Sequence, residues 1–440
     1  MDHSPKTLLK VLVTQRRWTA EKFIEQFDAT AQRIIKKGTK NPTLSVSQFR
    51  RWTAGNLQGL PAAAACEVLR EMFGVDAEAL FGPPPSSTTQ PAYNLEDEIA
   101  MTAQDAQDEA GAAAAQSISD TTLDQLRDDV LALARGYNNL SAFDVFRTGR
   151  ALREKVERQR DRTQVPSQQQ ELLVLAGQTC AMLSTAAFDL GSLNGATRLA
   201  RAAALYGETA RFGPLQAFAG GTLAYIAYFT GQPSQAVNLA QRAQMFAGLG
   251  DQGRQRLLAI QARAFGHVGN TANALRAMQA TEHDGAGERD VLHDEVGGEF
   301  GFSPERLAMS NGSTALLIGD GDLAEVSSKQ ALHLVQQRPA AQRSAPVIGG
   351  ASADVALARL LREDLDGAAA ALWALWEVPA DQRVTGLLLR TERVRQSLVG
   401  GRFRGSPLAT ELAERCEDFA FQAPQHQLNT GAAGPLALEA

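Results

Sequence analysis

The sequence predicts an all-α protein with a small N-terminal domain of five helices and a longer α-solenoid of helix pairs. Apolar residues recur at helical spacing along most of the chain, with no strand-like alternation. Short glycine-containing turns separate these segments at repeated intervals. In addition, 440 residues exceed one ordinary hydrophobic core. We therefore expect a domain at 1–82, a linker at 83–120, a repeat domain at 121–422 and a flexible tail at 423–440.

The first two helices are predicted from apolar faces and a cap. The segment Leu8–Leu12 places its leucines on one side of a short helix that ends near Trp18. Thr19 is a suitable N-cap for a second helix, which extends through Lys37 before a turn that contains Gly38. The buried face of this second helix is predicted to hold Phe23, Phe27, Ala31 and Ile34.

A third helix follows at Ser45–Gly55 and has two chemically different faces. Val46, Phe49 and Trp52 recur at i, i+3 and i+6 and are predicted to point into the core. The opposite face holds polar side chains. Arginine pairs well with guanine, glutamine with adenine, and hydroxyls with bases or phosphates. A fourth helix is predicted to begin at Pro61.

Charge is distributed unevenly along the chain. The segment Lys6–Leu60 contains eleven basic and three acidic residues, whereas the rest contains 32 basic and 46 acidic residues. A basic block on an acidic chain indicates contact with nucleic acid. A solvated basic face and a small protein-interaction domain remain alternatives. The predicted DNA-contacting residues are Ser45, Ser47, Gln48, Arg50, Arg51, Arg16, Arg17, Lys36 and Lys37.

These N-terminal residues resemble the Xre-type helix-turn-helix domain. The resemblance rests on Trp18–Phe23, on Gln48–Gly55, on Leu60–Val75 and on Leu80-Phe81. It implies that Ser47, Gln48, Arg50 and Arg51 face the DNA groove. It also implies a homodimer, since such domains usually read paired half-sites. The segment Gly38–Leu44 departs from the family, which joins its second and third helices by a tight turn.

The linker is acidic and rich in proline and alanine. No lysine or arginine occurs between Glu71 and Leu126. The proline-rich part at 82–91 disfavours a packed helix, whereas the alanine-rich stretch from Leu95 to Ala115 favours one. We expect a solvated tether, with docking of this acidic segment on the basic domain as the alternative.

Self-similar turns organise the rest of the chain. The turns begin at Gly191, Gly231, Gly269, Gly319 and Glu363, and a small residue follows five positions later in each: Ala196, Ala236, Ala274, Ala324 and Ala368. The pattern resembles a degenerate tetratricopeptide repeat (TPR) array. The whole chain resembles actinobacterial (Streptomyces-type) Xre-family regulators with C-terminal tetratricopeptide-like repeats. That resemblance implies control of development, specialised metabolism or mobile-element genes.

Other motifs predict no catalytic site, metal or cofactor. Gly319–Ala324 imitates a dinucleotide fingerprint but lacks the strand before it. His283 and His293 lie in an acidic, glycine-containing segment that is predicted to be a solvated loop. Tyr225 and Tyr228 are the candidate ligand-binding residues of the repeats, with a core role as the alternative.

The sequence thus predicts a transcriptional regulator and not an enzyme. Its expected partners are double-stranded operator DNA, a second copy of the chain bound through the repeats, and a peptide, small molecule or protein effector. The competing hypothesis is a scaffold or anti-activator that acts through its repeats. The absence of a long apolar run or an N-terminal leader pattern predicts a cytoplasmic protein without a membrane anchor.

Overall fold

The computed structural model describes residues 5–34, 41–84, 95–115, 117–282 and 287–425. Every regular element in these ranges is helical, so the all-α prediction is confirmed. The chain divides into two compact units, Met1–Asp105 and Ala106–Ala440. Lys36, Lys37 and residues 426–440 lie outside the described residues. Of the flexible tail predicted at 423–440, Ala423 and Gln425 are described, and both are buried.

In the described part of the N-terminal domain there are five helices: α1 (Leu8–Gln15), α2 (Ala20–Ile34), α3 (Val46–Ala54), α4 (Ala63–Phe73) and α5 (Ala77–Phe81). The Thr19 hydroxyl accepts a hydrogen bond from the amide of Lys22, which confirms the predicted N-cap of α2. The predicted start of the fourth helix at Pro61 is wrong. Ala62 keeps an extended backbone with φ −56° and ψ 145°, so helical geometry begins only at Ala63.

An aromatic cluster forms the core of this domain. The Phe23 ring is fully buried and lies 4.7 Å from the Phe49 ring and 6.1 Å from that of Phe73. Trp52 is buried on the inner side of α3, as predicted. Val46 is 36% exposed, which corrects its prediction as a core residue. As the first residue of α3, it lies ahead of the part of the helix that packs on α2.

The predicted linker helix is present as α6 (Leu95–Ala115). Its described side chains from 98 to 111 are exposed. Over residues 98–111 the helix has no buried apolar face, which fits its alanine-rich and acidic composition.

Among the residues described from 117 to 425, the C-terminal domain has fourteen α-helices. It also has three 3₁₀ turns, η1 (Tyr137–Asn139), η3 (Ala340–Gln342) and η4 (Ala380–Gln382), and a short π-helix, η2 (Val291–Val296). The helices are α7 (Asp120–Gly136), α8 (Ala142–Arg160), α9 (Pro166–Asp189), α10 (Leu193–Thr209), α11 (Gly213–Phe229), α12 (Pro233–Ala243), α13 (Asp251–His267), α14 (Thr271–Glu282), α15 (Pro304–Leu317), α16 (Gly321–Gln336), α17 (Ala345–Leu361), α18 (Leu365–Trp376), α19 (Thr385–Val399) and α20 (Pro407–Phe421).

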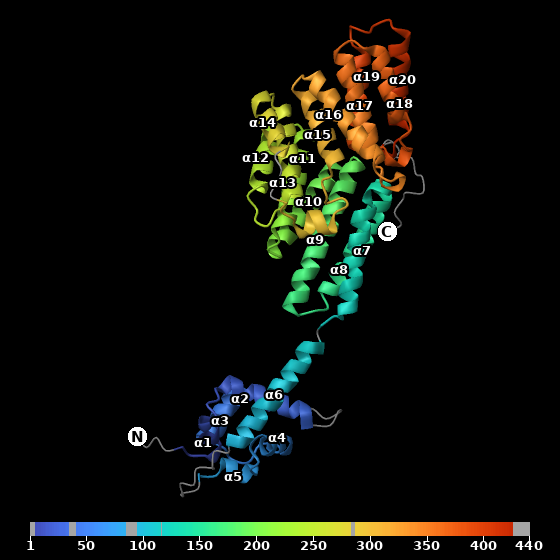
Figure 1. Cartoon of the computed structure of the whole chain (residues 1–440). Coiled ribbons are helices and arrows are strands. Elements are labelled where there is room, and N and C mark those ends of the chain that lie inside the picture. The colour runs from blue at the N-terminus through green and yellow to red at the C-terminus, as the bar shows by residue number, and fades with distance from the viewer. Residues whose placement is uncertain (1–4, 35–40, 85–94, 116, 283–286, 426–440) are drawn as a thin grey trace. The chain divides into compact units, whose positions relative to one another are not determined.

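The helices from α9 onward pack in two layers. Most consecutive helices lie side by side (Figure 1), with α14–α15 and α18–α19 as the exceptions, and the odd-numbered helices from α9 to α19 also contact one another in succession. The odd-numbered layer is therefore buried between its neighbours. α9 is long and apolar enough to cross a membrane, but 78% of its apolar window is buried inside the domain, as in the core helix of a soluble protein.

The turns between paired helices share one backbone conformation. Their first residues all have positive φ, and the alanines five positions later are fully buried where the second helix meets the first. The turn residues are Gly191 (φ +85°), Gly231 (+75°), Gly269 (+72°), Gly319 (+80°) and Glu363 (+65°). Four of the five turns use glycine, which adopts this conformation without a Cβ clash.

We expect the substitution Glu363→Gly to raise the free energy of unfolding by about 0.5–1 kcal/mol, because it relieves left-handed strain at a small entropic cost. The Glu363 ion pair with Arg402 is exposed on both sides and contributes little. Urea unfolding followed by circular dichroism would measure the change. Glu363→Ala is the matched control, because it removes the same ion pair but keeps Cβ. Equal stability of the two variants would show that the positive φ of residue 363 does not strain a residue that carries a Cβ.

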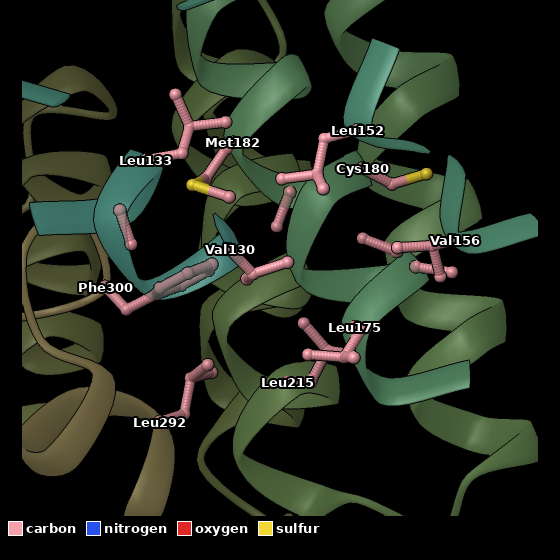
Figure 2. Packing of buried hydrophobic residues seen from close by; sticks show 14 of the residues in the cluster. Val130, Leu133, Leu152, Val156, Leu175, Cys180, Met182, Leu215, Leu292 and Phe300 are labelled. Atoms are coloured by element: carbon pink, nitrogen blue, oxygen red, sulfur yellow. The ribbon is translucent and has the colours of Figure 1, made fainter. Parts of the chain in front are cut away.

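The segment 287–303, which precedes α15, folds back into the domain. Leu292 and Phe300 are fully buried and pack with Val130 and Leu133 of α7 and Met182 of α9 (Figure 2). The amide of Glu299 donates a 2.9 Å hydrogen bond to the carbonyl of Ala134. These contacts place the segment against α7.

His293 lies in this segment, and the prediction of a solvated loop is wrong at this end of it, whereas residues 287–289 are exposed. The imidazole is 2% exposed, and its Nδ1 lies 2.9 Å from Asp290 Oδ2. Asp290 Oδ2 also accepts a hydrogen bond from the amide of Gly250. The buried pair attaches the segment to α13 and to the turn before it. His283 lies outside the described residues.

Candidate functional site

The polar face of α3 is held by caps at both ends of the helix. Ser45 is the N-cap, and its hydroxyl accepts a 3.2 Å hydrogen bond from the amide of Gln48. The Gln48 side chain in turn accepts a 2.9 Å bond from the Ser45 amide, which completes a capping box. Gly55 ends the helix at φ +72°. The local sequence thus fixes the start and the end of α3.

Ser47, Arg50 and Arg51 are exposed on α3, whereas Gln48 is half-buried. Among the described residues, neither arginine has an ion-pair partner within 4.0 Å, although Arg50 acts electrostatically on Glu21. Ser47 Oγ lies 3.0 Å from Ser45 Oγ. The face therefore offers two free guanidinium groups beside hydroxyls. Gln48 is engaged in the cap through its carbonyl oxygen.

Arg16 and Arg17 lie on the turn between α1 and α2. The Arg16 guanidinium lies 4.6 Å from the centre of the Phe73 ring and donates a 3.0 Å hydrogen bond to the carbonyl of Met72. Burial lowers the pKa of Arg16. These contacts give Arg16 a structural role in joining α1 to α4. Arg17 is exposed, with φ +54°. The remaining predicted DNA contacts, Lys36 and Lys37, lie outside the described residues.

The C-terminal domain contains a cavity of about 220 Å³. It is bounded by η1, by the inner helices α9, α11, α13, α15, α17 and α19, and by residues next to them. Its apolar wall includes Phe188, Ile226, Ile260, Val347 and Leu387. Its polar wall includes four arginines, which lie on three different helices.

Tyr225 and Tyr228, the two ligand candidates of the sequence, both line this cavity. Their rings meet edge to face with centroids 5.1 Å apart. Tyr228 is 5% exposed and stacks on His267 at 4.9 Å. Burial lowers the pKa of His267 to about 4, so this imidazole is neutral at physiological pH. Both tyrosines also pack among buried residues, and the core role is therefore present as well.

Two of the four cavity arginines are neutralised by carboxylates. Arg306 Nη2 lies 2.7 Å from Glu299 Oε2. Arg390 Nε lies 3.2 Å from Asp354 Oδ1, and its Nη2 donates a 2.8 Å hydrogen bond to Ser313 Oγ. Each pair is therefore electrically neutral, and the contacts of Arg390 connect α15, α17 and α19.

The other two arginines, Arg256 and Arg263, have no carboxylate within 4.0 Å among the described residues, although the charge of Glu299 acts on Arg256 and that of Asp354 on Arg263. Arg256 lies 3.9 Å from the centre of the Phe218 ring and donates hydrogen bonds to Thr222 Oγ1 and to the carbonyl of Phe218. Burial lowers the pKa of Arg256 to about 10, which leaves it charged at neutral pH. Arg263 is 8% exposed, and its Nε has no hydrogen-bond partner.

Asp189 supplies the remaining carboxyl group of the cavity. Burial and the nearby charge of Glu299 raise the pKa of Asp189 to about 7, while a hydrogen bond from the Tyr137 hydroxyl and the charge of Arg306 act in the opposite direction. Asp189 is therefore only partly ionised at neutral pH. The cavity as a whole has excess positive charge from Arg256 and Arg263.

Sequence reasoning missed these arginines. Arg256 and Arg263 are seven residues apart on α13 with Ile260 between them, a spacing that places all three on one helix face. Charged residues on an apolar face could have indicated an interior polar site.

No group of three or more metal-ligating side chains occurs among the described residues.

Comparison with known proteins finds no matching family model and no similar curated protein. Two parts of the described chain carry chemistry that indicates a function: the exposed face of α3 and the arginine-lined cavity.

Proposed function

We propose that the chain is a DNA-binding transcriptional regulator that inserts α3 into the major groove. The observation that carries the proposal is the exposed face of α3, where Arg50 and Arg51 have no ion-pair partner beside Ser47. A short helix with a buried aromatic face and free guanidinium groups on the other side suits guanine readout. The basic charge of Lys6–Leu60 supports attraction to phosphates.

In this proposal the N-terminal domain is of the Xre type, and the C-terminal domain is a tetratricopeptide-like solenoid. Two helix layers joined by turns with positive φ support the solenoid assignment. The C-terminal domain would join two copies of the chain into a dimer, because helix-turn-helix domains usually read paired half-sites. The dimer would act in the cytoplasm. The cavity supports a sensory role for the same domain.

We expect Arg51→Ala to weaken binding to a selected DNA duplex by about 1–3 kcal/mol and to relax sequence preference, because a base contact is lost. The duplex is selected from a random library with the wild-type chain, and affinity is measured by fluorescence anisotropy. Arg33→Ala is the matched control: Arg33 lies on α2 and pairs with Glu71, so the same charge is lost away from α3.

Salt dependence tests the proposal as a whole. DNA binding should weaken steeply as salt rises, because neutralised phosphates release counterions. A folded wild-type chain without salt-dependent DNA binding would overturn the proposal and favour the competing function, a scaffold or anti-activator. Equal losses for the Arg51 and Arg33 variants would remove Arg51 from the reading face.

A further inference from the structure

We infer that the cavity of the C-terminal domain binds a small organic acid, with its carboxylate held by Arg263, Arg256 and the Tyr228 hydroxyl. The inference rests on the proposed function, since it names the ligand class that a sensory domain would bind. The contacts that support it all lie in the C-terminal domain and do not depend on DNA binding.

Unpaired polar groups converge on one side of the cavity. The Tyr228 hydroxyl and Arg263 Nε are both buried, and neither has a partner at hydrogen-bond geometry, although the Arg263 guanidinium and this hydroxyl interact with each other. The Arg263 guanidinium lies 5.5 Å from the centre of the Tyr228 ring. The charges of Arg263, Arg390 and Arg256 all act on the Tyr228 hydroxyl. A buried donor without an acceptor is costly, and a bound carboxylate would satisfy several donors at once.

The charge of the cavity selects an anion. Arg306 and Arg390 are neutralised by Glu299 and Asp354, so the net positive charge belongs to Arg256 and Arg263. Burial raises the pKa of Tyr228, which keeps its hydroxyl protonated as a donor. A cationic or neutral ligand would leave the two arginines without a counter-charge.

The apolar side of the cavity favours a ligand whose part beyond the carboxylate is small and apolar. Phe188, Ile226, Ile260, Val347 and Leu387 line the cavity, and an aromatic ring or short alkyl chain would bury its surface against them. An apolar cavity of about 150 Å³ is large enough for benzene. The 220 Å³ found here accommodates a single ring or a medium-length chain with one carboxylate.

Calorimetry on the full chain, without DNA, tests the inference. The probes are benzoate, 3-phenylpropanoate and octanoate, each compared with its uncharged primary amide. We expect at least one acid to bind and its amide to bind at least about tenfold more weakly, because the amide lacks the charge that the arginines recognise. The C-terminus of a peptide is the other possible source of the carboxylate. A tetrapeptide with a free C-terminus, compared with the same tetrapeptide amidated at its C-terminus, tests this source. Binding of the free-acid peptide alone would overturn the small-acid assignment.

Two variants localise the site. Arg263→Met should weaken binding of the acid by about ten- to a hundredfold, and Tyr228→Phe by less, while both chains stay folded. Without acid, Arg263→Met should be as stable as wild type or more so, because the guanidinium has no carboxylate partner; a merely structural arginine would instead destabilise. Arg276→Met on the exposed face of α14 is the control.

Failure of wild type to bind any of the three acids, or equal binding of acid and amide, would overturn the inference. Neither result affects the DNA measurement, so the two proposals fail separately. Undiminished binding by the Arg263 variant would show that the acid binds to another part of the chain, and it would also overturn the assignment.

Discussion

Replacement of Arg390 by methionine is expected to lower the free energy of unfolding of the C-terminal domain by about 3–5 kcal/mol. Asp354 is fully buried, and Arg390 is its ion-pair partner, at 3.2 Å. Without the guanidinium, the carboxylate would stay in a low-dielectric interior, where the Ser313 hydroxyl is its one remaining donor among the described residues and the charges of Arg263 and Arg393 act on it without direct contact. Urea unfolding followed by circular dichroism measures the loss.

Two further variants separate charge burial from packing. The double variant Arg390→Met with Asp354→Leu should recover most of the lost stability, because no uncompensated charge remains. Arg402→Met breaks only an exposed pair with Glu363 and should change stability by less than about 0.5 kcal/mol. If the double variant is as unstable as the single one, packing rather than charge determines the effect.

The second large effect is expected from Phe23→Ala in the N-terminal domain. This ring is fully buried and contacts four other aromatic rings, so its removal should cost about 3–5 kcal/mol and leave a cavity under α3. Differential scanning calorimetry of the full chain should show a lower transition temperature for this domain alone, because the two units are separately compact.

Lys22→Ala is the control for this substitution. Lys22 precedes Phe23 on the same helix and forms an exposed pair with Glu25, so its loss should change stability by less than about 0.5 kcal/mol. A Phe23 variant within about 1 kcal/mol of wild type would contradict the assignment of this ring to the centre of the core. Loss of DNA binding by a Phe23 variant that stays folded would point to a direct role of α2.

Local patterns were sufficient for the helices and for the two-faced α3. Phe49 and Trp52 are buried and Arg51 is exposed because a helix of known period must separate them, and Ser45 and Gly55 mark its ends through their own backbone chemistry. The same reasoning failed for Val46. Periodicity assigns a face, but it does not say whether the first turn of a helix reaches the core.

The cavity could not be predicted in the same way. Its polar wall joins Tyr137, Asp189, Arg263 and Arg390, which lie up to 253 residues apart and meet only after the helices stack. His293 shows a related limit. Its glycine-rich, acidic surroundings are typical of an exposed loop, yet Leu292 and Phe300 bury the segment against α7. Tertiary packing decided both cases.

The two ends of the helix stack also touch. The backbone carbonyl of Asp189 in α9 accepts hydrogen bonds from Thr385 Oγ1 of α19, at 3.0 Å, and from Gln425 Nε2. In an open repeat protein each repeat contacts only its neighbours, so repeats can be added or lost during evolution without disturbing distant ones. Here an added or deleted helix pair would separate Asp189 from its partners. The number of helix pairs is therefore fixed by closure of the stack, and insertion or deletion of one pair should destabilise this domain more than it would an open array.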